Sequence, residues 1–594
     1  MAFLEEKRER ADEGAEQHEG AHDEARAPAA VDRPGEEHER DGAEGDGAGD
    51  DVNAGGAGGD VPVARSPRDW LRGAPLPGRV HLALGLVLPA LVLVVNMVRV
   101  RSFTIDDAYI SYRYARNLAR GLGLVYNAGE RIEGYTNFLW TVLLAGGIRI
   151  GLDPDVLAKV LGGLAACGSL GALYLLSDRL RPLGAIPCIA TWLFASSIVQ
   201  SGYAVFGLET PLFILLVLAG TEMMFRERDR GTGFPYSGLA FGLAGLTRPE
   251  APMFIGIPML FLGLRFFGRQ NLLRGAVFAA PIACHMLWRH SYYGTWLPNT
   301  LSAKTGSLAE QIAGGQRYLT EYAQHTGPVL LLALFGLCVA IVARHRDALC
   351  VAALALAVAG YVLLVGGDWM PFYRFMSPFE PFCFLLAGLG ARALLEPLLT
   401  ALSARAAEVR ARRAIALAAS AGVLAAGSIV ALGVFRTAKL ERAQHRILDD
   451  DKRFWDSAAG GTAAWFQQHG QPGEIAVGDI GYIGYATDYP ILDLLGLVDP
   501  VISKLPGGYT RKTGPGYVQR VFDKAPRYFV FVGSPDTCDK LPFPAQEKLR
   551  KDRRFRGVYE VSGMIRHSKG GYWCVFERRD DAPPPSPPTE AAPR

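Results

Sequence analysis

Long apolar runs dominate the middle of the chain. They have the length of membrane-crossing helices and recur between Val80 and Phe435. We predict eleven spans, at residues 80–98, 156–177, 183–202, 208–225, 236–248, 251–267, 273–290, 327–343, 348–366, 375–396 and 414–435. The segment 136–150 is also apolar, but we interpret it as a helix on the membrane surface. Counting it as a span would reverse the orientation of every later segment.

Arginines recur in every second connection between the predicted spans. With eleven spans and the N-terminus inside, the cytoplasmic connections hold Arg179, Arg181, Arg226, Arg228, Arg230, Arg265, Arg269, Arg274, Arg344, Arg346, Arg405, Arg410, Arg412 and Arg413. The opposite loops are poorer in Lys and Arg, although Arg99 and Arg101 depart from the pattern. The positive-inside rule therefore predicts a multi-pass protein of the inner (cytoplasmic) membrane with a cytoplasmic N-terminus.

The two ends of the chain differ from the apolar middle. Residues 1–60 carry 19 Asp and Glu against 6 Lys and Arg, so we interpret residues 1–75 as a disordered acidic cytoplasmic extension. After the membrane part (76–435), residues 436–579 alternate β-rich apolar runs with Gly, Pro and charged turns, and the runs are IAVGDIGYIGYA, YPILDLLGL, RYFVFVG and GGYWCVFERR. The predicted fold is a polytopic all-α transmembrane bundle with a C-terminal extracytoplasmic α/β domain. The Pro-rich residues 580–594 form a disordered tail.

Adjacent carboxylates follow the first predicted span. Asp106 and Asp107 can cap the next helix, because Asp is favoured at the N-cap and in the first turn. Successive helical residues lie about 100° apart, so one carboxylate can cap while the other points elsewhere. A carboxylate is also the group that accepts a proton from an attacking hydroxyl in sugar transfer. We rank Asp106 slightly ahead as this base, with Glu133 and Asp368 as the next candidates.

Three cations lie beside aromatic, Gly or Pro residues on the same predicted side as these carboxylates. They are Arg248 in LTRPE, Lys304 after YYGTWLPNT and Arg374 in GGDWMPFYR. Interfacial anchoring explains any one of them. Together they indicate a phosphate site, since Arg matches phosphate by its bidentate geometry. The same loops offer Glu133, Asn299 and Asp368 as substrate-binding groups for a sugar.

Two cysteines, Cys538 and Cys574, lie outside the predicted spans, in the part of the chain predicted to be external. That compartment lets disulfides persist, and two strands of one small sheet can bring the pair together. We predict a disulfide, with two unpaired thiols as the alternative. No cluster of residues with metal-ligand spacing is present, so we predict no metal site, although Asp106 and Asp107 leave a divalent ion open.

The polar motifs also carry a family resemblance. The first loop resembles the signature of the GT-C membrane glycosyltransferases, in the sequence DDAYISYRYARNLARGLGLVYNAGERIEGYTNFLW. It is most similar to the branch of the mycobacterial terminal β-(1→2)-arabinofuranosyltransferases. The motifs LTRPE, YYGTWLPNTLSAK, GGDWMPFYRF and VGDIGYIGY…DLLGLVDP also resemble that branch, so the likeness covers roughly residues 80–580.

The resemblance implies an inverting transfer of a sugar from a polyprenyl-phosphate donor to a glycan or lipid acceptor of the cell envelope, outside the cytoplasmic membrane. The acidic motif of the family falls on Asp106 and Asp107. The donor sugar, arabinofuranose or another, and the choice of base stay open. The rival hypotheses are a transporter or flippase of lipid-linked sugars and a non-catalytic scaffold that displays the C-terminal domain. No nucleic-acid partner is indicated.

Overall fold

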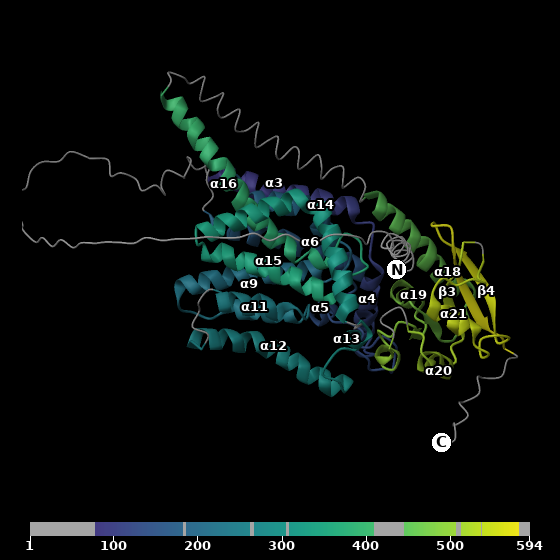
Figure 1. Ribbon diagram of the computed structural model, residues 1–594. Coiled ribbons are helices and arrows are strands. Elements are labelled where there is room, and N and C mark those ends of the chain that lie inside the picture. Colours follow the sequence, from purple (N-terminus) through teal and green to yellow (C-terminus); the bar gives the residue numbers. More distant parts are fainter. Residues whose placement is uncertain are drawn as a thin grey trace, which may run out of the picture. The chain divides into compact units, whose positions relative to one another are not determined.

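The computed structural model describes residues 78–181, 186–261, 267–304, 308–408, 445–506, 512–535 and 537–580. The predictions for residues 1–75, for the span at 414–435 and for the tail after Asp580 lie outside these ranges. The apolar part is helical, and Figure 1 shows α9, α11 and α12 following one another across the bundle. Its helices are α2 (Gly78–Leu82), η1 (Ala83–Val87), α3 (Leu88–Val100), α4 (Asp106–Ala119), α5 (Phe138–Arg149), α6 (Pro154–Leu180), α7 (Ile189–Ser196), α8 (Ile198–Tyr203), α9 (Thr210–Arg230), α10 (Tyr236–Gly245), α11 (Ala251–Phe261), α12 (Arg269–Tyr293), α13 (Asn299–Lys304), α14 (Leu308–Val342), α15 (Arg346–Val365), η2 (Arg374–Met376) and α16 (Phe379–Glu408).

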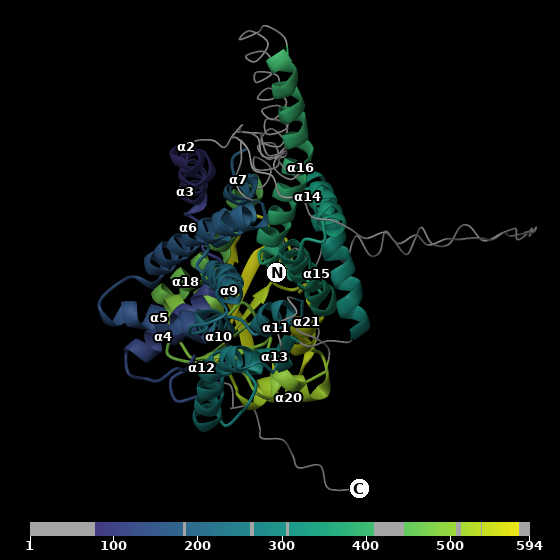
Figure 2. The same cartoon turned by 90° about the vertical axis from the view of Figure 1, so that its left-hand side faces the viewer.

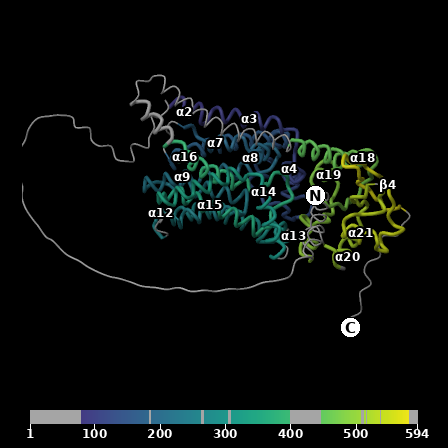
Figure 3. The backbone as a smooth tube through the Cα atoms, turned by 45° about the horizontal axis from the view of Figure 1, so that its top comes forward, coloured from purple at the N-terminus to yellow at the C-terminus, as the bar shows by residue number. Residues whose placement is uncertain are grey.

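Within the described ranges, four helices are long and apolar enough to cross a membrane: Gly78–Val100, Pro154–Leu180, Leu308–Val342 and Arg346–Val365. The first of these is α2, η1 and α3 joined end to end, which Figure 3 shows as one rod. Each other described predicted span also coincides with helix. The described part of the predicted span at 183–202 is two helices rather than one. The chain breaks at Ser197, whose hydroxyl accepts a hydrogen bond from Gln200 N and so begins α8.

The connection between α3 and α6 returns to the end of the bundle from which it left. Thr104, just after α3, donates to Asp155 Oδ1 at the start of α6 over 2.8 Å. Asp153 begins α6 as its N-cap, with Pro154 in the first turn. Helix α5 lies between these two points, so residues 136–150 add no net crossing. This geometry agrees with leaving the segment out of the spans.

Predicted cytoplasmic arginines gather at another common end of the helices. Arg179 from α6 lies 2.6 Å from Asp229, which is near the end of α9. Arg228 binds Asp347, in the first turn of α15. The connections that the positive-inside pattern assigns to one side therefore do meet in the structure.

Close helix packing depends on small residues at crossing points. Helices α14 and α16 contact each other, as Figure 2 shows. A Cβ on Gly336 would lie 1.9 Å from the carbonyl oxygen of Leu386, and one on Gly390 would lie 2.4 Å from that of Leu332. Small residues let helix backbones approach in a membrane, where packing takes over from the hydrophobic effect.

The C-terminal part contains one five-stranded mixed sheet in the order β2-β1-β3-β5-β4. Strands β1 and β2, and β1 and β3, run parallel, whereas β5 is antiparallel to both β3 and β4. The predicted α/β class is therefore found in residues 445–580 as described. The elements are η3 (Asp456–Gly460), α18 (Gly461–His469), β1 (Ile475–Val477), α19 (Gly481–Thr487), β2 (Ile491–Asp493), η4 (Ile502–Lys504), α20 (Pro515–Asp523), β3 (Tyr528–Val532), α21 (Pro544–Lys551), β4 (Tyr559–Arg566) and β5 (Tyr572–Arg578).

One interpretation of this sheet needs correction. The run IAVGDIGYIGYA is predicted to be β-rich, but only its first three residues form a strand, and Gly481–Thr487 is helix α19. Strand β4 was not foreseen. Most of its residues are exposed and only two are buried, which gives a weak apolar pattern, and it is an edge strand.

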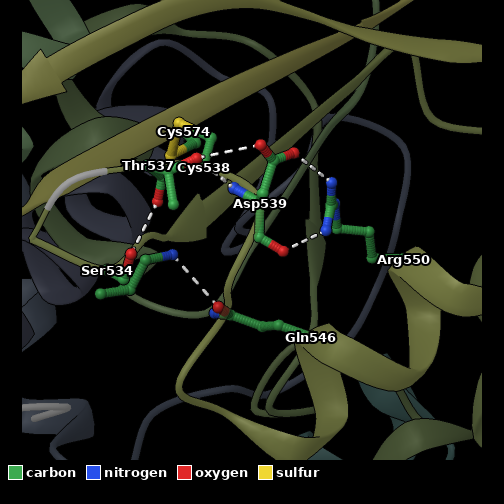
Figure 4. Close-up of a disulfide and its surroundings, with 8 residues drawn as sticks. Ser534, Thr537, Cys538, Asp539, Gln546, Arg550 and Cys574 are labelled. Carbon is green, nitrogen blue, oxygen red and sulfur yellow. Dashed lines mark hydrogen bonds and ion pairs between the residues drawn. A yellow bond between two sulfur atoms is a disulfide. The ribbon is translucent and has the colours of Figure 1, made fainter.

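The structure joins Cys538 and Cys574 in a disulfide, with their Cα atoms 5.8 Å apart (Figure 4). Cys574 lies in β5, and Cys538 follows β3 in a turn where Ser534 N donates to the carbonyl of Thr537. Arg550 of α21 binds Asp539 next to the bridge over 2.6 Å. The bridge therefore ties this turn and α21 to the sheet.

Candidate functional site

Helix α4 presents the two predicted carboxylates in its first turn. Ile105 is its N-cap residue, in an extended conformation (φ −76°, ψ 144°), and is fully buried. Its N–H donates to the carbonyl of Phe206 over 3.2 Å, which fixes the start of the helix on the bundle. No side chain at the N-cap bonds to the first turn. Asp106 and Asp107 therefore stand at the positive end of the helix dipole.

Asp106 is 6% exposed and binds the backbone of the C-terminal domain. Its Oδ2 accepts the Gly481 N–H over 3.0 Å and its Oδ1 accepts the Tyr482 N–H over 2.8 Å. Burial, and after it the charge of Asp479, raises the pKa of Asp106 to about 7. The sequence predicts that one of the two carboxylates caps the helix that follows it. Asp106 does cap a helix, but that helix is α19 and not α4. Both oxygens of the residue ranked first as the base are thus engaged.

Asp107 has different surroundings. It is half-buried, and no hydrogen bond or ion pair links its carboxylate to another side chain in the described ranges. Its charge acts on Arg374 and on Asp479. Of the two adjacent carboxylates, Asp107 is the one that has room to accept a new hydrogen bond.

Arg374 has 11% of its side chain exposed and is oriented by Asp368. The Nε atom of Arg374 lies 2.7 Å from Asp368 Oδ2, and Asp368 Oδ1 accepts the Tyr318 hydroxyl over 3.0 Å. Burial alone would lower the pKa of Arg374, but the carboxylates of Asp368 and Asp107 raise it. Phe372 and Tyr373 just before it have φ of 61° and 54°, a left-handed backbone that non-glycine residues rarely adopt. Such strain is typical of sites where one side chain must be held in one place.

Arg248 is committed to two carboxylates. Its Nη1 lies 2.9 Å from Glu209 Oε1, and its Nε binds Glu250. These two glutamates match the charge of Arg248, and its role as a phosphate cation stays a prediction. Arg248 and Arg374 both lie near the Phe375 ring, at 5.7 Å and 4.9 Å from its centre. The two predicted cations do share one locality.

The remaining candidates have structural partners. Glu133 is buried against Arg289, with 2.6 Å between Oε2 and Nε, so it offers no free carboxylate. Asn299 donates to the carbonyls of Gly496 and Leu497 over 2.8 Å and 2.9 Å. These contacts give both side chains a structural role, and substrate binding by Glu133 and Asn299 stays a prediction. Lys304 is the last residue of α13, and its side chain lies outside the described parts.

Much of the first-loop signature holds the C-terminal domain. Arg113 donates to the carbonyls of Gly484 and, over 2.7 Å, Tyr489. Arg116 donates to the carbonyl of Tyr485 over 2.9 Å and forms an ion pair with Asp488. Figures 1 and 3 show α4 beside α19. Helix α19 is thus held at its N-terminal amides by a carboxylate and at its C-terminal carbonyls by two guanidinium groups, which suits its dipole.

Sequence reasoning missed Asp479, which comes to the site from the C-terminal domain. It follows strand β1 and stands two residues before the Gly481 N–H that binds Asp106. Burial raises its pKa, and Asp107 adds to the shift. An acidic residue directly after a strand in VGDIGYIGY was the available signal, but the run was assigned to strand. Among the described residues, no group of three or more His, Cys, Asp or Glu has a metal-binding arrangement.

Comparisons with solved structures identify the architecture. The chain is similar to ArnT from Cupriavidus metallidurans bound to undecaprenyl phosphate, with a TM-score of 0.53, 14% identity and coverage of 84% of this chain and 99% of ArnT. It is also similar to the oligosaccharyltransferase AglB from Archaeoglobus fulgidus in complex with an inhibitory peptide and a dolichol-phosphate. There the TM-score is 0.51 at 12% identity, over 85% of this chain and 75% of AglB. The chain has the GT-C fold.

Sequence relatives narrow the likeness within the GT-C fold. The chain is 30% identical over 315 residues to a terminal β-(1→2)-arabinofuranosyltransferase of Corynebacterium glutamicum, covering 46% of this chain and 45% of the relative. A protein of the same name from Mycobacterium tuberculosis is 30% identical over 243 residues, 37% of this chain and 38% of the relative. The chain thus spans less than half the length of these curated relatives. Residues 446–576 match a family model described as a domain of unknown function, DUF8728. The resemblance seen in the motifs is confirmed.

Proposed function

We propose that this chain is a glycosyltransferase of the cytoplasmic membrane. It transfers a sugar, for which arabinofuranose is the first candidate, from a polyprenyl-phosphate donor to an envelope glycan or lipid on the outer side. The observation that carries the proposal is Asp107, a carboxylate without a described partner, whose charge acts on the largely buried Arg374 within a GT-C fold. The likeness to arabinofuranosyltransferases supports the donor sugar.

Asp107 acts as the general base. It accepts the proton of the attacking acceptor hydroxyl while the new bond forms at the anomeric carbon of the donor. The bond from that carbon to the phosphate oxygen breaks on the opposite face, so the configuration inverts. The electron pair leaves with the phosphate, whose negative charge needs a nearby cation.

Arg374 is the described cation best placed for the leaving phosphate. Asp368 engages its Nε, and no hydrogen bond from its terminal nitrogens reaches another described residue. A guanidinium has five N–H donors, so these terminal groups remain for phosphate oxygens. Asp368, which Tyr318 holds by a hydrogen bond, orients the guanidinium group of Arg374. Arg248 lies on the same Phe375 ring and adds positive charge nearby, but it stays paired with Glu209 and Glu250.

Transfer by purified protein tests the assignment. We expect the full chain in detergent to move label from polyprenyl-phosphate arabinofuranose, within a panel of polyprenyl-phosphate sugars, to a glycan acceptor or slowly to water. Asp107→Asn should reduce the rate about 10²–10⁴-fold. Asp106→Asn is the matched control and should lose less than about tenfold, because its amide oxygen still accepts one N–H. Near-normal turnover of Asp107→Asn would refute its role. In liposomes, vectorial movement of donor without transfer would favour a transporter.

Orientation is a separate part of the proposal. Arg453 in the C-terminal domain has 68% of its side chain exposed, and Arg226 at the end of α9 has 44%. A membrane-impermeant thiol reagent on intact cells should label Arg453→Cys and leave Arg226→Cys unlabelled until the cells are opened. The reverse result would place the site on the cytoplasmic side and refute the proposed topology.

A further inference from the structure

The segment Gly478-Asp479-Ile480 links strand β1 to helix α19. It lies at the carboxyl end of a strand that has parallel neighbours on both sides. In open sheets with parallel strands, ligands bind outside these carboxyl ends, where the chain turns into the following helix. This turn is therefore the place in the C-terminal domain where a ligand contact is expected.

Contacts on both sides of Asp479 fix this turn to the first loop. The hydroxyl of Tyr126 donates to the carbonyl of Ile480 over 2.5 Å, and the Gly481 N–H binds Asp106. A Cβ on Gly481 would lie 2.1 Å from the Asp106 carbonyl oxygen, so the two backbones are in close contact. Since consecutive Cα atoms are about 3.8 Å apart, Asp479 is held near Asp107.

Among the described residues, Asp479 nevertheless has no polar partner of its own. It is half-buried, and no hydrogen bond or ion pair joins its carboxylate to another residue in the described ranges. A partly desolvated carboxylate costs free energy unless hydrogen-bond donors reach it. Two carboxylates close together also repel each other, which makes their retention side by side costly. Donors supplied by a bound molecule would relieve both costs.

Aromatic rings beside the same turn indicate the class of that molecule. Tyr482 contacts Tyr109 with 4.9 Å between ring centres, and Tyr485 contacts Tyr109 at 5.6 Å. All three tyrosines are half-buried, so part of each remains exposed. Half-exposed rings next to carboxylates suit a sugar, which has apolar C–H faces and hydroxyl donors on its edges.

We propose that Asp479 is a specificity-determining residue that binds the acceptor sugar through a hydroxyl next to the one that attacks. The acceptor site then draws on both parts of the chain, with Asp107 from the first loop and Asp479 from the C-terminal domain. The inference rests on the proposed function. Asp479 accepts a hydrogen bond and takes no covalent part. Proton transfer to Asp107 and departure of the phosphate remain as described.

The experiment separates acceptor binding from chemistry. Asp479→Asn and Asp479→Ala are assayed in the full-length protein for transfer to a glycan acceptor and for donor hydrolysis, in which water replaces the acceptor. We expect the KM for the acceptor to rise at least about tenfold, with hydrolysis and the KM for the donor within about twofold of wild type. Asp456→Asn, which removes an exposed surface pair with Lys452, is the matched control and should change nothing.

An acceptor analogue sharpens the test. Wild type should discriminate against acceptors that lack the neighbouring hydroxyl, and Asp479→Asn should lose that discrimination. The missing hydroxyl and the substitution remove the same hydrogen bond, so their effects should not add. Unchanged transfer, or equal loss of transfer and hydrolysis, would overturn the inference and leave the proposed function standing. Wild-type protein that neither transfers nor hydrolyses any donor of the panel would refute the proposed function itself.

Discussion

The docking of helix α19 onto Asp106 should weaken as the pH rises, because the buried carboxylate then becomes charged. Asp106 has a pKa of about 7 when α19 is docked, against 3.8 for an ordinary Asp, because of burial first and Asp479 second. Between these values the docked state binds more protons than the undocked state. Docking is therefore strongest at low pH and loses free energy as the pH rises through 7.

The size of the effect follows from the shift. Three pKa units correspond to about 4 kcal/mol at 1.36 kcal/mol per unit, most of it between pH 4 and pH 7. Hydrogen–deuterium exchange of the Gly481 and Tyr482 amides reports this opening directly, since both donate to Asp106. After correction for intrinsic exchange, their protection should fall about 100-fold between pH 5 and pH 8.

Variants isolate the group responsible. Burial also raises the pKa of nearby Asp479, so the informative quantity is the difference between wild type and Asp106→Asn, which carries no titrating group at this position. The Asn variant should show little pH dependence at the two amides. In Asp479→Asn the midpoint should move to lower pH, because one repelling charge is gone. The same pH dependence in wild type and Asp106→Asn would refute the reasoning.

Three further predictions concern other contacts. Replacing Cys538 and Cys574 by Ser should destabilise the C-terminal domain by about 3–4 kcal/mol, seen as a lower Tm, while transfer persists; free thiols at both positions in non-reduced peptides of wild type would contradict the bridge. Gly481→Ala should reduce transfer more than tenfold, because its Cβ would meet the backbone of Asp106 at 2.1 Å; unchanged turnover would show that the close contact is not needed. Arg374→Ala should weaken donor binding by about 1.5–3 kcal/mol, measured as donor KM in the transfer assay, and Arg374→Lys should restore part of this loss. Equal donor KM in wild type and both variants would show that Arg374 does not bind the donor phosphate.

The helical bundle was predictable because membrane helices are coded locally. Length and apolarity place nearly every described helix, and the break at Ser197 was missed because a run of apolar residues hides a local cap. The sheet was harder to assign. GYIGYAT has strand-like composition but forms α19, because Asp106, Arg113 and Arg116 satisfy its two ends from elsewhere in the chain.

The site was predictable as a set of residue types but not as a set of pairings. Sequence reasoning selected Asp107, Asp368 and Arg374, which do lie in one neighbourhood. It could not show that Arg248 pairs with Glu209 or that Glu133 pairs with Arg289. These partners lie 39 and 156 residues apart along the chain. Asp479 escaped for the same reason, since only the docking of α19 brings it to Asp107.

The contact between Asp106 and Gly481 also constrains how the protein is made. The two residues are 375 positions apart, and α4 leaves the ribosome long before α19 exists. At about 5–20 residues per second, that interval is roughly 20–75 s. During it, the nascent chain already has most of its membrane helices but lacks the amides that hold Asp106 and the turn that carries Asp479. Every truncated or stalled product that ends before Gly481 therefore inserts into the bilayer with an unassembled carboxylate site.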